Sequence, residues 1–128
     1  LLTKVSWAFG DPPSDSIETF AKSVVDYQTA IRGNADEWHP NEPALQVSRV
    51  LISFEYWLDD DQVDEDLEIV TSMASGFSNL ELLYKIHNAV SSKLADCDRR
   101  YFEGLVLIKS QEPSGTATPP HYAVSLGS

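Results

Sequence analysis

Two stretches of the chain repeat apolar residues with the 3.6-residue period of an α-helix. The apolar face of the first consists of Ile17, Phe20, Ala21, Val24 and Ile31, and Gln28 interrupts it. Asp15, with Glu18 three residues later, predicts the N-cap of this helix, and Gly33 predicts its end. The sequence therefore predicts an amphipathic helix that begins just after residue 15.

The second helical pattern runs from Leu80 to Leu94. Ser78 and Glu81 have the spacing of a capping box at its start. His87 lies off the strongest apolar stripe, so we expect this side chain on the helix surface. The pattern predicts a second amphipathic helix with one buried face.

Other stretches alternate apolar and polar residues every second position, as strands do. Residues 45–58 form one long pattern of this kind, and the run 67–73 follows the acidic segment 59–66, which we expect to be the loop of a hairpin. Residues 101–108 and 121–126 predict a second hairpin, joined by a loop over 110–120 that is rich in Pro, Gly, Ser and Thr. A short strand is also indicated near Val5–Phe9.

These elements predict an α+β fold, with an antiparallel sheet of four or five strands and two amphipathic helices packed on one face. The length of 128 residues suits a single domain over 1–128. The face opposite the helices is expected to be open and mixed in character. Its expected residues are Leu51, Trp57, Tyr101, Leu105 and Leu107, interspersed with Arg49, Glu55, Glu68 and Glu103.

Charge is the strongest compositional signal. Nine Lys and Arg residues against twenty Asp and Glu give a net charge of −11, which disfavours binding to nucleic acid and to anionic membranes. No basic residue lies between Arg49 and Lys85, where nine carboxylates occur: Glu55, Asp59, Asp60, Asp61, Asp64, Glu65, Asp66, Glu68 and Glu81. Such a run indicates either a solvated surface or a surface that attracts a basic partner.

The motifs of several chemistries are absent from the sequence. Counted from Asp59, Asp64 and Val70 occupy the positions where an EF-hand loop requires Gly and Glu, and the glycines form no phosphate-binding loop. We therefore expect no cofactor and no metal site. The single cysteine, Cys97, favours a reducing, cytoplasmic location, and no apolar run approaches the roughly 20 residues of a membrane span.

One alternative hypothesis is a small enzyme or ligand-binding domain. His121 begins the last predicted strand on the open face, where Glu55 or Glu103 could approach it across the sheet. A Glu and His pair could transfer protons, although no nucleophile motif accompanies it. We therefore consider an enzyme the less favoured interpretation.

The favoured hypothesis is a protein-binding domain. Aromatic side chains ringed by carboxylates suit docking onto a basic protein. The expected partner-binding residues are Trp57, Glu55, Asp59, Asp60, Asp61, Asp64, Glu68, Tyr101 and Glu103. The alternatives are that the chain itself covers this face or that a homodimer forms through it. In size and charge the chain is similar to bacterial immunity proteins, which implies an inhibitor of a basic toxin such as a nuclease.

Overall fold

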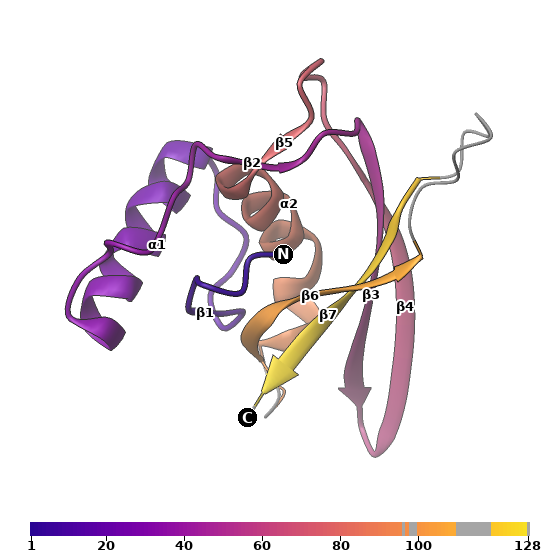
Figure 1. Cartoon of the computed structure of the whole chain (residues 1–128). Helices are drawn as coiled ribbons and strands as arrows, with labels where there is room; N and C mark the ends of the chain where they lie inside the picture. Colours follow the sequence, from indigo (N-terminus) through magenta and orange to yellow (C-terminus); the bar gives the residue numbers. More distant parts are fainter. Residues whose placement is uncertain (96, 98–99, 110–118, 128) are drawn as a thin grey trace.

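The computed structural model describes residues 1–95, 97, 100–109 and 119–127 (Figure 1). It confirms an α+β fold with two helices and a five-stranded sheet. The elements in chain order are β1 (Trp7–Ala8), α1 (Ile17–Arg32), β2 (Pro43–Leu45), β3 (Arg49–Leu58), β4 (Asp61–Val70), β5 (Phe77–Ser78), α2 (Asn79–Leu94), β6 (Tyr101–Lys109) and β7 (His121–Gly127). Most of the loop predicted over 110–120 lies outside the described residues.

The sheet has the strand order β1-β6-β7-β3-β4. Both predicted hairpins form, β3 with β4 and β6 with β7, and the predicted N-terminal strand pairs with β6 at one edge. The two hairpins meet through β3 and β7, which run parallel over Leu51–Ser53 and 121–123. The sheet is therefore mostly antiparallel, with one short parallel junction at its centre. A separate two-stranded sheet joins β2 and β5, whose strands are too short to show a sequence period.

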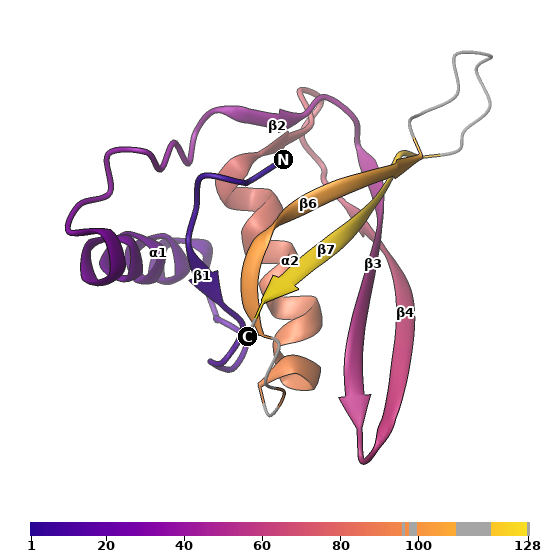
Figure 2. The ribbon, with the colours of Figure 1, turned by 60° about the horizontal axis from the view of Figure 1, so that its bottom comes forward.

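The two helices take different positions on the same side of the sheet (Figures 1 and 2). α2 packs directly against β3, whereas α1 packs against α2 and the edge strand β1. α2 begins as predicted, with the Ser78 hydroxyl accepting the Glu81 N–H at 3.1 Å. In α1 the N-cap is Ser16 rather than Asp15, because the Ser16 hydroxyl accepts the Thr19 N–H. Within the described residues, neither helix has the length and apolar character needed to cross a bilayer.

The predicted surface position of His87 is wrong, since this side chain is only 1% exposed. Its Nδ1 accepts a hydrogen bond from Trp7 Nε1 at 3.2 Å, and its Nε2 donates to the Pro12 carbonyl oxygen at 3.1 Å. Burial lowers the pKa of His87 from its ordinary value. A hydropathy pattern treats imidazole as polar, and it could not anticipate that distant segments supply both hydrogen-bond partners.

The acidic segment is mostly strand, which corrects the loop expected over residues 59–66. β3 and β4 pair over their whole length, from Arg49 opposite Val70 to Leu58 opposite Asp61. Only two residues, Asp59 and Asp60, separate the strands, and Asp59 has a left-handed φ of 56°. Val63, Leu67 and Ile69 hold alternate, more buried positions of β4, but Glu65 holds the position between Val63 and Leu67, so the run of carboxylates at 64–66 hides the strand period.

The expectation that Leu105 lies on the open face is also wrong. The β6–β7 register shifts between Phe102 and Gly104, and Gly104 has a φ of 120°. This bulge inserts one extra residue into β6, so Phe102 and Leu105 both lie buried against the core. A side chain at position 104 would also lie only 3.0 Å from Thr3 Cγ2, so the N-terminal segment requires glycine there.

Candidate functional site

The outward side of the β3–β4 hairpin is defined by the register of the two strands. The buried residues Val50, Ile52 and Phe54 face α2, so the alternate residues of β3 face away from the helices. Four cross-strand pairs form this outer face: Leu51 with Glu68, Ser53 with Asp66, Glu55 with Asp64, and Trp57 with Gln62. We call these eight residues the outer face of the hairpin.

Glu55 and Asp64 form a like-charge pair at the centre of the outer face. Residues directly opposite each other on antiparallel strands have Cβ atoms about 5 Å apart, and like charges in that arrangement are destabilising. Both side chains are exposed. Among the described residues, no Lys, Arg or His forms an ion pair with either carboxylate. The free chain therefore holds a repulsive pair that a bound cation would relieve.

Other carboxylates of the acidic stretch do have cationic partners, which the sequence order does not reveal. Glu65 pairs with Lys93 of α2, and this hydrogen bond lowers the pKa of Glu65 and raises that of Lys93. The Arg49 Nη1 atom lies 3.6 Å from Glu68 Oε2. The Glu81 Oε2 atom lies 3.7 Å from Lys85 Nζ on the same helix. The negative charge without a described ion pair is thus concentrated at Glu55, Asp64 and Asp66 and at the hairpin tip, Asp59–Asp61.

β3 and β7 diverge beyond their short paired stretch (Figure 2), and a cleft lies between them beside this charge. Their pairing ends at Ser53 and Ala123, whereas both strands continue, to Leu58 and Gly127 respectively. The resulting hollow has a volume of about 390 Å³. Its lining combines acidic residues with apolar and aromatic ones: Ser53, Phe54, Glu55, Tyr56, Trp57, Asp64, Asp66, Cys97, Ile108, Ala123, Val124 and Leu126. We call this hollow the β3–β7 cleft.

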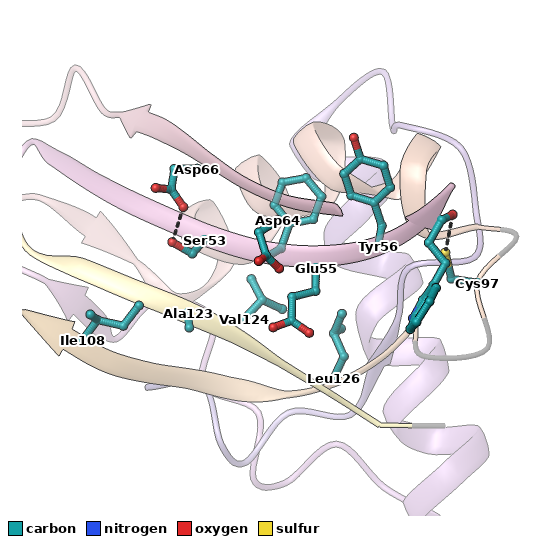
Figure 3. Close-up of a pocket in the computed structure, with 12 residues that line it drawn as sticks. Ser53, Glu55, Tyr56, Asp64, Asp66, Cys97, Ile108, Ala123, Val124 and Leu126 are labelled. Atoms are coloured by element: carbon teal, nitrogen blue, oxygen red, sulfur yellow. Dashed lines mark hydrogen bonds between the residues drawn. The ribbon is translucent and has the colours of Figure 1, made fainter. Parts of the chain in front are cut away.

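Figure 3 shows how the acidic side chains lie in the β3–β7 cleft. The Glu55 carboxylate occupies the space between β3 and β7, and the Asp64 carboxylate points toward the same space from β4. Val124 and Leu126 line the opposite wall. Cys97 lines the cleft beside Trp57, and its Sγ lies 3.8 Å from the Trp57 carbonyl oxygen. The cleft therefore combines acidic side chains from β3 and β4 with apolar side chains from β7.

A row of hydrogen-bonded side chains crosses the sheet where the pairing of β3 with β7 ends. The Ser53 hydroxyl donates to Asp66 and contacts Nε2 of His121. Serine lies between the carboxylate and the imidazole here, whereas a serine nucleophile needs the imidazole in the middle to remove its proton. The row joins β4, β3 and β7 where the parallel junction ends.

The structure brings together only part of the predicted partner-binding set. Trp57, Glu55 and Asp64 all line the β3–β7 cleft, and Trp57 is 50% exposed, so the described chain leaves half of its surface uncovered. The predicted residues Asp59, Asp60 and Asp61 lie at the hairpin tip. Glu68 lies toward the opposite end of β4. Tyr101 and Glu103 lie on β6, which β7 separates from β3.

The residues of the alternative enzyme hypothesis do not converge. His121 lies opposite Leu51, four residues along β3 from Glu55, which corresponds to about 13 Å at the rise of a strand. Glu103 lies near the far end of the β6–β7 hairpin, whereas His121 pairs with Lys109 at its near end. Asp66, acting through Ser53, takes the place expected for a glutamate beside His121.

Sequence reasoning missed the β3–β7 cleft and the contributions of Ser53, Asp66 and Leu126 to it. The cleft depends on a parallel junction between strands about 70 residues apart, for which the sequence carries no local signal. Within the described ranges, no three potential metal ligands gather at one point. No protein-family model, curated protein or solved structure matches the chain.

Proposed function

We propose that this chain is an acidic protein-binding domain whose partner is a basic protein, bound at the outer face of the hairpin. The observation that carries the proposal is the combination of a half-exposed Trp57 with Glu55 and Asp64, two opposed carboxylates that form no described ion pair. The most concrete form is an immunity-type inhibitor that neutralises a basic toxin, such as a nuclease, in the cytoplasm.

The chemistry of such an interface divides between Trp57 and the carboxylates. Exposed tryptophan is enriched among the few residues that supply most of the binding energy of an interface. Carboxylates on the same face accelerate the approach of a basic protein and repel acidic ones. The active site of a nuclease is basic because it binds phosphates, so an acidic protein can occupy it.

A second copy of this chain is a less suitable partner for the outer face. Each chain carries a net charge of −11, and a two-fold contact would bring the two sets of carboxylates together. Like charges across an interface oppose association. We therefore favour a basic heterologous partner over the homodimer.

The proposal is tested by affinity capture from the source organism with four baits. The baits are the wild type, Trp57→Ala, the double variant Glu55→Gln/Asp64→Asn, and the control Asp26→Asn, which removes one exposed charge from α1. We expect the wild type and the control to retain one basic protein that both outer-face variants lose. The charge variant keeps the test decisive if Trp57→Ala lowers folding stability. Equal retention by all four baits would refute the outer face as the binding site.

The retained protein is then tested for the two properties that the proposal requires. Its association rate with the wild type should fall as ionic strength rises from low values to about 0.15 M, where charges are screened over about 8 Å. If it is a toxin, co-expression of this chain should restore growth of cells that produce it, and the double variant should not. A rate independent of salt would rule out electrostatic steering.

A further inference from the structure

We infer that the β3–β7 cleft accepts a short extended segment of the basic partner, which pairs with the part of the β3 edge that no described strand covers and places an arginine side chain between Glu55 and Asp64. This inference rests on the proposed function and specifies how that partner is recognised.

The direction of the β3 hydrogen bonds determines which of its main-chain groups face the cleft. The Leu51 N–H donates to the Pro120 carbonyl oxygen at 2.9 Å, so the polar groups of Leu51 face β7. Main-chain groups alternate in direction along a strand, so those of Ser53, Glu55 and Trp57 face the same way. Pairing with β7 ends at Ser53, so the N–H and carbonyl of Glu55 and the N–H of Trp57 open into the β3–β7 cleft. The Trp57 carbonyl oxygen instead accepts the Cys97 thiol at 3.8 Å.

The β7 wall of the cleft also presents main-chain groups to it. The Pro120 carbonyl faces β3, so by the same alternation the main-chain groups of Val124 and Leu126 also face the cleft. Both side chains line it. Strand edges without a neighbouring strand, as these are within the described part of the chain, are where extended peptides add to sheets, with main-chain hydrogen bonds giving affinity and side-chain pockets giving specificity.

The carboxylates at the rim of the cleft favour a cationic side chain. A strand added beside β3 alternates its side chains between the two faces of the sheet, as β3 does. The side chain on the outer face meets the carboxylates of Glu55 and Asp64, which repel each other in the free chain. A cation there adds two attractive contacts that offset the repulsion between Glu55 and Asp64, whereas an acidic side chain would add two further repulsions.

Arginine fits the outer-face position better than lysine does. Its planar guanidinium donates several hydrogen bonds at once and can bridge two carboxylates, whereas an ammonium acts as a point charge. Trp57 lies two residues beyond Glu55 on the same face and is 50% exposed, which offers an indole surface for the guanidinium to stack on. The volume of about 390 Å³ also accommodates a large side chain.

The test uses the full chain and four capped peptides, followed by amide NMR shifts. The first peptide is acetyl-Thr-Val-Arg-Val-Thr-amide; the others replace its Arg with Lys or Glu, or carry N-methyl groups on alternate residues. At about 1 mM, a concentration that detects even millimolar dissociation constants, we expect the Arg peptide to shift the amides of Glu55, Trp57, Val124 and Leu126. We expect the Glu and N-methyl peptides to bind at least about tenfold more weakly.

Variants of the chain provide the matched comparison. Glu55→Gln should weaken binding of the Arg peptide about fivefold, since it removes one of two charge-assisted contacts. Asp26→Asn, a charge change on α1, should leave the affinity unchanged. A Glu peptide that gains affinity for the double variant Glu55→Gln/Asp64→Asn would further support a direct contact.

The outcomes separate this inference from the proposed function. If the N-methyl peptide binds as tightly as its parent, or if the Arg peptide leaves the cleft amides unmoved, strand addition is wrong. In both cases a basic protein captured through the outer face would leave the proposed function intact. If neither the peptide nor any basic protein engages the outer face, both the inference and the proposed function fail.

Discussion

The opposed carboxylates of Glu55 and Asp64 predict that neutralising either one stabilises the free protein. Two charges about 6 Å apart repel by about 0.7 kcal/mol in a medium with the dielectric constant of water. This value lies within the range of roughly 0.2–1 kcal/mol measured for cross-strand pairs. We therefore expect Asp64→Asn and Glu55→Gln each to raise the free energy of unfolding by about 0.7 kcal/mol at low salt.

A double-mutant cycle measured by urea unfolding provides the assay. The double variant should be about as stable as each single variant, because the first substitution already removes the repulsion. At about 0.15 M salt the gain should fall to roughly half, since the Debye length is then about 8 Å. Strictly additive effects of the two substitutions, or gains that do not respond to salt, would refute the argument that these side chains repel each other.

Three further predictions concern the core and the helix caps. Gln28 is 1% exposed and accepts the Ser6 N–H at 2.8 Å, so Gln28→Leu leaves that N–H without its acceptor. The free energy of unfolding in urea should fall by about 1–3 kcal/mol, and an unchanged urea midpoint would contradict this. Burial lowers the pKa of His87, so as pH falls the unfolded chain takes up a proton before the folded chain does. The free energy of unfolding should be at its full value above about pH 6.5 and decrease as pH falls toward the lowered pKa, and unfolding curves that coincide at pH 7.5 and 5.5 would contradict this. Ser78→Ala should cost about 1 kcal/mol and Ser78→Asn much less, by thermal unfolding, because Asn retains an oxygen for the Glu81 N–H.

The elements of the fold were predictable where the pattern is local. Both helices and both hairpins follow from periodicity, and Ser78 marks the start of α2 as expected. The start of α1 differs by one residue, since Asp15 and Ser16 are both good caps and only the turn geometry selects Ser16. The bulge at Gly104 could not be predicted, because it lies where Thr3 of the distant N-terminal segment packs closely against β6.

The candidate site was predictable only in its chemistry. Trp57, Glu55 and Asp64 stood out as an aromatic residue among carboxylates, and the register places them on one cleft. Tyr101 and Glu103 seemed equivalent in the sequence, but the strand order puts β7 between them and β3. Strand order and the pairing of charges such as Glu65 with Lys93 are decided by long-range packing, which local patterns do not encode.

The most direct test of the account is the dissociation rate of the captured basic partner from Trp57→Ala, measured by surface plasmon resonance. If Trp57 is a central anchor of the interface, its loss should accelerate dissociation about 30-fold, corresponding to about 2 kcal/mol. The control Asp26→Asn should dissociate at the wild-type rate. A folded Trp57→Ala variant that releases the partner as slowly as the wild type would contradict the central claim that this face binds the partner.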